Sequence, residues 1–309
     1  MAHDHTHIVD SDPSTTRRLA LSIGLTAVFV LVEVAAGLFA NSLALLTDAA
    51  HNLTDILALV LTLWALRATI KPAHSGKTYG YHRAGILVAL VNSTTLVVIA
   101  LGIFYDAYRR LLAPPEVKAD VLIGIGALAV VVNLVTALLV RQGSKGDLNL
   151  RSAYLHLMGD VLSTVGAVAA GIAIRFTGLN WLDPVVSIFI GLLILWNAWG
   201  ILRESVNILM EATPEDVDVE AVVADILHVE GVRGVHDLHI WSITRSLRTL
   251  SAHILTDDIP LSAGAKIHSA VSELLASTHG IAHATLQLEC AGCIPDGLYC
   301  DITANNHNH

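Results

Sequence analysis

The sequence predicts a six-helix transmembrane bundle followed by a small cytoplasmic α+β domain. Of its 309 residues, 54% are hydrophobic and only 15% are charged, with a mean hydropathy of +0.62. This composition is too apolar for a water-soluble domain, so the solvent of most of the chain is a lipid bilayer. The apolar residues fall into blocks of about 20, the length of helix that crosses ~30 Å of hydrocarbon. These blocks end near Met210, and a more polar segment follows.

Six spans are predicted from these blocks. Only Asn41 and Ser42 separate the first from the second, which indicates a tight helical hairpin. Pro114 and Pro115 interrupt helical structure between the third and the fourth. The six spans cover residues 17–40, 43–66, 84–108, 121–140, 152–176 and 184–210.

The orientation of the spans follows from their flanking basic residues, because the cytoplasmic side of a membrane protein carries more Lys and Arg. Ten such residues flank one side and four flank the other. We therefore expect both termini in the cytoplasm and the bundle in the plasma (inner) membrane. The polar, His-rich tail, residues 1–16, lacks the basic and apolar regions of a cleaved signal peptide. The expected organisation is this tail, a transmembrane domain over 17–210 and a cytoplasmic metal-binding domain over 211–309.

The cytoplasmic segment alternates helical and strand patterns. Residues 217–229 and 262–278 have the apolar spacing of helices, whereas 235–243, 249–256 and 282–289 read as strands. The order αββαβ predicts a compact, ferredoxin-like domain with an open antiparallel sheet.

Charge and cysteine content exclude two classes of protein. A formal net charge of −9 leaves no concentrated basic surface, so no nucleic-acid partner is expected. The cysteines Cys290, Cys293 and Cys300 all lie in the last twenty residues, which does not suit a disulfide scaffold. Their placement favours a reduced compartment or metal ligation.

Ionisable residues lie in the middle of two predicted spans, where each costs ~2.5 kcal/mol or more to insert and usually faces a partner inside the bundle. The second span reads DAAHNLTD, which puts Asp48, His51 and Asp55 on one helical face. The fifth reads HLMGD, which puts His156 and Asp160 one turn apart. Two inward-facing His-x-x-x-Asp motifs offer two nitrogens and two carboxylates, the four-coordinate set that Zn²⁺ prefers. Asp48 then lies one turn away, either as a residue behind the ligands that orients His51 or as a relay on the exit path.

A structural reading of the same residues is that they form interhelical hydrogen bonds. We apply that reading to three other polar residues at membrane depth, Glu33, Asn92 and Asn133, which we expect to make interhelical or water-lined contacts.

At this point the sequence resembles the cation diffusion facilitator family of metal/proton antiporters. The resemblance covers nearly the whole chain and rests on NSLALLTDAAHNLTD, TYGYHRAG, HLMGD and the segment from EATPEDVD to GVHDLHIW. It implies that His51, Asp55, His156 and Asp160 form the transport site, and that the soluble domains join two copies as a homodimer. A His at the first position of the second-span motif resembles the zinc-preferring branch.

In the cytoplasmic segment, the resemblance places further metal ligands most closely at His236, His253 and the pair Gln287 and Glu289. Gln287 is a poor zinc ligand, so nearby groups are alternatives. These alternatives are His239, His283 and the C-x-x-C pair Cys290 and Cys293. His74 and His82, in the loop between the second and third spans, either bind metal or are merely solvated.

The expected function is export of Zn²⁺ in exchange for protons, with Zn²⁺ also a regulatory ligand of the soluble domain. An unperturbed His pKa of ~6.5 lets proton and metal compete for one nitrogen. Co²⁺, Cd²⁺ and Ni²⁺ remain possible, because all accept nitrogen and oxygen ligands. Two other functions stay open from the residues alone: an intramembrane zinc hydrolase with Asp48 as general base, and a metal sensor without transport.

Overall fold

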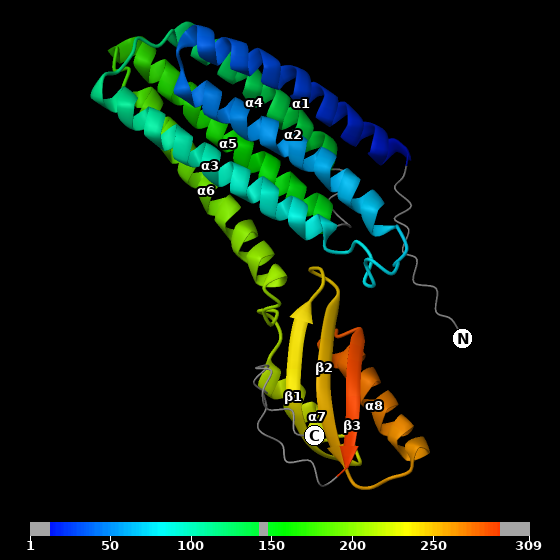
Figure 1. The fold of residues 1–309 in the computed structure, drawn as a ribbon. Coiled ribbons are helices and arrows are strands. Elements are labelled where there is room, and N and C mark those ends of the chain that lie inside the picture. The colour runs from blue at the N-terminus through cyan, green and yellow to red at the C-terminus, as the bar shows by residue number, and fades with distance from the viewer. Residues whose placement is uncertain (1–12, 142–147, 291–309) are drawn as a thin grey trace. The chain divides into compact units, whose positions relative to one another are not determined.

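The computed structural model describes residues 13–141 and 148–290, without the side chains of 13–23, 25, 139–141, 148–153, 155 and 156. The described residues cluster into two compact units. One is built from residues up to Leu63 together with Val91–Ile201, and the other from Trp64–Leu90 together with the residues from Leu202 on. Six long helices precede the sheet: α1 (Pro13–Ala40), α2 (Leu43–Thr69), α3 (Ala84–Leu112), α4 (Ala119–Arg141), α5 (Leu148–Thr177) and α6 (Leu182–Leu209) (Figure 1).

These helices have the composition of membrane spans. Among the described residues, α2 to α6 are each long and apolar enough to cross a bilayer, and α1 adds a shorter apolar stretch, Thr26–Ala40. Large apolar side chains cover their outer surface; Leu31, Phe189 and Trp196 are 71%, 62% and 82% exposed. Such exposure is unfavourable in water and expected in lipid. The predicted class, a transmembrane helical bundle with an α+β domain after it, is confirmed.

Small residues allow the helices of the first unit to approach closely. α4 packs against both α1 and α5 (Figure 1). Ala44, Ala167 and Ala198 are at most 1% exposed and meet in one cluster with Leu96, Ile190 and Ile194. Small interfacial residues bring backbones together where lipid provides no hydrophobic driving force between helices.

The predicted hairpin between α1 and α2 turns at Asn41, whose φ of 56° lies in the left-handed region that Asn tolerates better than most residues. The Ser42 N–H then donates to the Gly37 carbonyl oxygen at 3.0 Å, which closes the end of α1. At the start of α2, Asp183 from α6 accepts hydrogen bonds from the Ser42 hydroxyl and from the Leu43 N–H. Asp183 is fully buried, and its role in this turn is invisible in the pattern of apolar residues.

The cytoplasmic elements follow the predicted order: α7 (Val219–Leu227), β1 (Val232–Ser242), β2 (Arg248–Thr256), α8 (Leu261–His279) and β3 (His283–Cys290). Buried side chains alternate along β1 and β2, so one face of the sheet packs on the two helices. The core of this packing is formed by Val222, Ile226, Leu238, Ile240, Leu250, Ile254, Val271 and Leu275.

One prediction about the sheet was wrong. The strand order is β1-β2-β3, with β1 and β2 antiparallel as expected, but β3 runs parallel to β2. The reason is the helix α8 between them, since a strand–helix–strand connection carries the chain back to its starting edge before the next strand begins.

Candidate metal sites

The first candidate site joins α2 to α5 inside the bundle. His51 Nε2 lies 3.2 Å from Asp160 Oδ1 and 3.7 Å from Asp55 Oδ2. His51 and Asp160 are 8% and 7% exposed, and Asp55 is half-buried. One donor atom from each of the three residues lies within 4.8 Å of the other two, as the ligands of a single ion would. Helical geometry explains the arrangement, because residues four apart on α2 share a face and α5 supplies the facing carboxylate.

His156, the fourth residue of the sequence-predicted set, belongs to α5 and lies one turn before Asp160. Its side chain falls outside the described part of the chain. The structure therefore brings together His51, Asp55 and Asp160 and leaves the position of the His156 imidazole undescribed.

A layer of polar side chains lies behind these three residues. Thr164 Oγ1, on α5, is 2.8 Å from the Asp160 carbonyl oxygen and 3.3 Å from Asp48 Oδ2 on α2. Asn133, on α4, donates to Thr164 Oγ1 at 3.4 Å. A hydroxyl has one proton and two lone pairs, so Thr164 can serve all three partners only by donating to one oxygen at a time. Asp48 is 2% exposed and lies one helical turn from His51.

The same layer extends to α1 through Glu33. Asn52 Nδ2, on α2, donates to Glu33 Oε2 at 3.3 Å, and Glu33 is 0% exposed. The interhelical contacts expected for these residues are thus present. Glu33 joins α1 to α2, and Asn133 joins α4 to α5.

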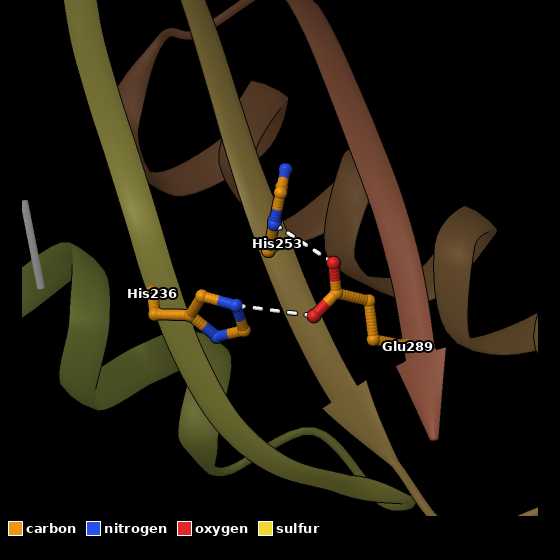
Figure 2. Close-up of side chains that lie close together, drawn as sticks. All are labelled: His236, His253 and Glu289. Carbon is orange, nitrogen blue, oxygen red and sulfur yellow. Dashed lines mark ion pairs between the residues drawn. The ribbon is translucent and has the colours of Figure 1, made fainter. Parts of the chain in front are cut away.

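The second candidate site lies on the face of the sheet opposite to the helices (Figure 2). His236 on β1 and His253 on β2 are register partners, with ring centroids 5.2 Å apart. Glu289 on β3 lies against both, with Oε2 3.1 Å from His236 Nε2 and Oε1 2.9 Å from His253 Nδ1. His236 is 7% exposed. These three residues offer donor atoms within 4.8 Å of one another, so each strand of the sheet contributes one donor.

Sequence reasoning missed Asp237, which contacts two histidines of this sheet. Its carboxylate lies 3.1 Å from His239 Nε2 and 3.4 Å from His253 Nε2. Strict alternation along a strand would put Asp237 and His236 on opposite faces. The register of β1 is shifted between His236 and His239, and Asp237 has a φ of 48°. Such a bulge re-aims side chains, and the motif HDLH alone does not reveal it.

The other predicted ligands are not part of this group of three donors. His239 pairs with Asp237, and Gln287 donates to Glu289 Oε1 at 2.8 Å. His283 is exposed at the opposite end of β3 from Glu289. Cys290 is exposed at the end of β3, and Cys293 lies outside the described residues.

In the loop between α2 and α3, His74 and His82 belong to no group of three or more possible metal-binding side chains among the described residues. His74 Nε2 lies 3.3 Å from the Tyr81 hydroxyl, and His82 is exposed.

Two family models match the chain, the cation efflux transmembrane domain over residues 19–210 and the cytoplasmic domain of cation efflux proteins over residues 214–291. The chain belongs to the cation diffusion facilitator family. It is 36% identical over 293 residues to the metal cation efflux system protein CzcD of Cupriavidus metallidurans, covering 95% of this chain and 92% of the relative.

Two other relatives of this family member span nearly the same length. It is 38% identical over 292 residues to the cadmium, cobalt and zinc/H(+)-K(+) antiporter of Bacillus subtilis, covering 94% of this chain and 92% of the relative. It is 34% identical over 314 residues to the zinc transporter ZitB of Escherichia coli, covering 100% and 99%. A solved metal-bound C-terminal domain of the CzcD transporter is 33% identical and covers 24% of this chain and 99% of that one, with a TM-score of 0.22.

Family membership decides between the broad functions left open by the residues. This cation efflux protein is a multi-pass membrane transporter of metal cations, and its relatives are transporters rather than enzymes. The alternative function, an intramembrane zinc hydrolase, is therefore excluded.

Proposed function

We propose that this family member exports Zn²⁺ from the cytoplasm in exchange for protons, and that His51, Asp55, His156 and Asp160 bind the transported ion. The observation that carries the proposal is the position of the His51 imidazole between two carboxylates from two different helices.

The distances at this site support metal coordination over simple hydrogen bonding. Zinc–ligand bonds of 2.0–2.2 Å in a tetrahedron separate neighbouring ligand atoms by about 3.4 Å. His51 Nε2 lies 3.2 Å from Asp160 Oδ1 and 3.7 Å from Asp55 Oδ2, on either side of that value. The longer separation exceeds a hydrogen bond. One ring nitrogen facing two carboxylates therefore suits a shared cation better than two direct bonds.

Charge supports the same assignment. The carboxylates of Asp55 and Asp160 neutralise a divalent cation inside the bundle, where an uncompensated ion would be desolvated at great expense. His156, one turn from Asp160 on α5, would complete the tetrahedral set.

Exchange for protons follows from the histidines. A proton and Zn²⁺ bind the same imidazole nitrogen and exclude each other, so a proton gradient can drive metal release. The printed name of the Bacillus subtilis relative, a cadmium, cobalt and zinc/H(+)-K(+) antiporter, supports both proton exchange and a wider range of metals. The ZitB relative supports Zn²⁺ as the main substrate. With basic flanks on the cytoplasmic side, the proposed location is the plasma (inner) membrane with both termini inside.

We propose that the chain consists of a tail over residues 1–16, a transmembrane bundle over 17–210 and a cytoplasmic domain over 211–309. This cytoplasmic domain is proposed to bind a second Zn²⁺ and to join two copies as a homodimer. Its donors suit that ion, because His236, His253 and Glu289 supply two nitrogens and a carboxylate. The orientation of His253 supports this fit. Its Nδ1 faces Glu289 while its Nε2 faces Asp237, the carboxylate partner that metal-bound histidines commonly have on their second nitrogen.

The experiment is metal flux in sealed vesicles that contain the purified protein, measured with and without a pH gradient. Zn²⁺ should accumulate against its gradient only when protons can flow in the opposite direction. Flux that is independent of the pH gradient would refute proton exchange, and an absence of Zn²⁺ flux would refute the assigned substrate.

A further inference from the structure

Two carboxyl groups lie side by side in the bundle. Glu33 of α1 and Asp48 of α2 are 0% and 2% exposed. Asp48 and Asn52 lie one turn apart on one face of α2, and the Glu33 side chain interacts with both. Asn52 donates to Glu33 Oε2. The other oxygen, Oε1, is buried and receives no hydrogen bond from the described residues. Two ionised carboxylates have only acceptors, so their contact requires a proton.

The surroundings add one carboxylate and one imidazole, which is positively charged when it is protonated. α2 contributes His51 beside the pair, and α5 contributes Asp160 and the Thr164 hydroxyl, which lies 3.3 Å from Asp48 Oδ2. The side of α4 offers the neutral amide of Asn133. Lys and Arg occur in α1, α2, α4 and α5 only near the ends of the helices. Like charges in a buried pair cannot both ionise without large cost, so the favoured state carries one proton.

We propose that Glu33 holds a proton, donates it in a hydrogen bond to the Asp48 carboxylate, and releases it when a metal ion occupies the site of His51, Asp55 and Asp160. This inference rests on the proposed function and adds a proton carrier that does not ligate the metal. In the step, the Glu33 O–H bond breaks, and the proton leaves to the side from which the metal entered. The pair changes from one negative charge to two, which attracts the dication one turn away.

The coupling is reciprocal. If metal binding favours loss of the Glu33 proton, then holding that proton must weaken metal binding by the same factor. Glu33 reaches the site through Asp48 and Asn52, neither of which is a proposed ligand. A proton here therefore competes with the metal through charge, whereas a proton on His51 would compete for the nitrogen itself.

The test uses infrared difference spectroscopy on the full-length protein in lipid nanodiscs, grown with ¹³C-labelled glutamate and measured with and without Zn²⁺ at neutral pH. The expected result is a protonated-carboxyl band in the metal-free protein that shifts with the label, disappears with Zn²⁺ and is absent in Glu33→Gln. If the metal-free protein has no protonated glutamate band, the proposal is overturned.

A second measurement counts the protons released when Zn²⁺ binds in weakly buffered solution. Glu33→Gln and Asp48→Asn should each release about one proton fewer than the unsubstituted chain while still binding metal. The matched control is Asp106→Asn, which removes a carboxylate from the α3 ion pair with Arg110 and should leave the count unchanged. Unchanged proton release in a folded Glu33→Gln would contradict the proposal.

The two measurements separate this inference from the proposed function. If Zn²⁺ fails to bind, the proposed substrate is wrong, and the metal-free infrared band still decides whether Glu33 is protonated. If Glu33→Gln does not fold, the labelled unsubstituted protein and Asp48→Asn still decide the outcome.

Discussion

Asp183 on α6 holds the first turn of α2 through both of its carboxylate oxygens, with Oδ1 2.6 Å from the Ser42 hydroxyl. Its Oδ2 lies 2.6 Å from the Leu43 nitrogen, and Oδ1 is also 3.3 Å from the Ala44 nitrogen. The first N–H groups of a helix have no partner within that helix, and a negative charge at this end also suits the helix dipole. The cap comes from a residue 140 positions away along the chain. The cap therefore fixes the position of the start of α2 relative to α6. Because His51 lies on α2, its position is fixed as well.

Replacing Asp183 with Ala should lower stability by about 1–3 kcal/mol, because it leaves buried donors without an acceptor. The stability of Asp183→Asn should lie between that of Asp183→Ala and that of the unsubstituted protein, because an amide oxygen can still accept a hydrogen bond. Thermal unfolding of the purified protein in detergent measures the effect. The control is Asp120→Ala on α4, whose ion pair with Arg175 is exposed and should matter little. Equal melting temperatures for Asp183→Ala and the unsubstituted protein would contradict the capping role.

Asp55→Ala and Asp160→Ala should each abolish Zn²⁺ transport while leaving membrane insertion intact. Each substitution removes a proposed ligand and a compensating charge from the group around His51. The measurement is Zn²⁺ flux in vesicles with matched amounts of inserted protein. The control is Asp106→Ala, which makes the same carboxylate-to-alanine change outside the cluster and should transport Zn²⁺ at the unsubstituted rate. Transport at the unsubstituted rate in either site variant would remove these residues from the pathway.

His51→Asp should broaden transport toward Cd²⁺. The change replaces a directional ring nitrogen with an adaptable carboxylate at the same position of α2. It also adds a negative charge near Asp160, which keeps the site attractive to a dication. The variant should therefore lose selectivity between Zn²⁺ and Cd²⁺ rather than only lose affinity for metal. The ratio of Zn²⁺ to Cd²⁺ flux, measured in competition, checks this. If the ratio does not move, selectivity resides in other residues.

The isolated cytoplasmic domain, residues 211–309, should melt at a higher temperature with Zn²⁺. An ion that binds only the folded state at 100 times its dissociation constant stabilises by ~2.7 kcal/mol. His236→Ala combined with His253→Ala should remove most of this gain, because the two rings face the same carboxylate. His268→Ala, at an exposed position of α8, serves as the control. A double variant that still gains full stability from Zn²⁺ would leave these histidines a structural role only.

Much of the architecture was predictable from residue patterns, because bilayer thickness and side-chain alternation impose periods on the sequence. The hairpin at Asn41 and Ser42 and the order αββαβ both follow from such periods. The pairing of His51 with Asp160 was predictable for a different reason. Charged groups at membrane depth require partners, and the two spans carried matching motifs.

Other features depend on contacts that no local pattern records. The parallel direction of β3 follows from the crossover through α8, and the cap on α2 comes from Asp183 on α6. Asp237 faces His253 only because β1 is bulged there. Each of these involves a backbone irregularity or a distant partner, so spacing along the chain gave no signal for it.

The three strands of the cytoplasmic sheet are synthesised in the order in which they supply His236, His253 and Glu289. The carboxylate arrives last, after α8 has been made and has carried the chain to the edge of β2. A ribosome-bound chain that lacks β3 therefore presents two imidazoles without their shared acid, and cannot form the three-donor cluster. The three-donor cluster can therefore form only once β3 has paired with β2 and all three strands of the sheet are in place.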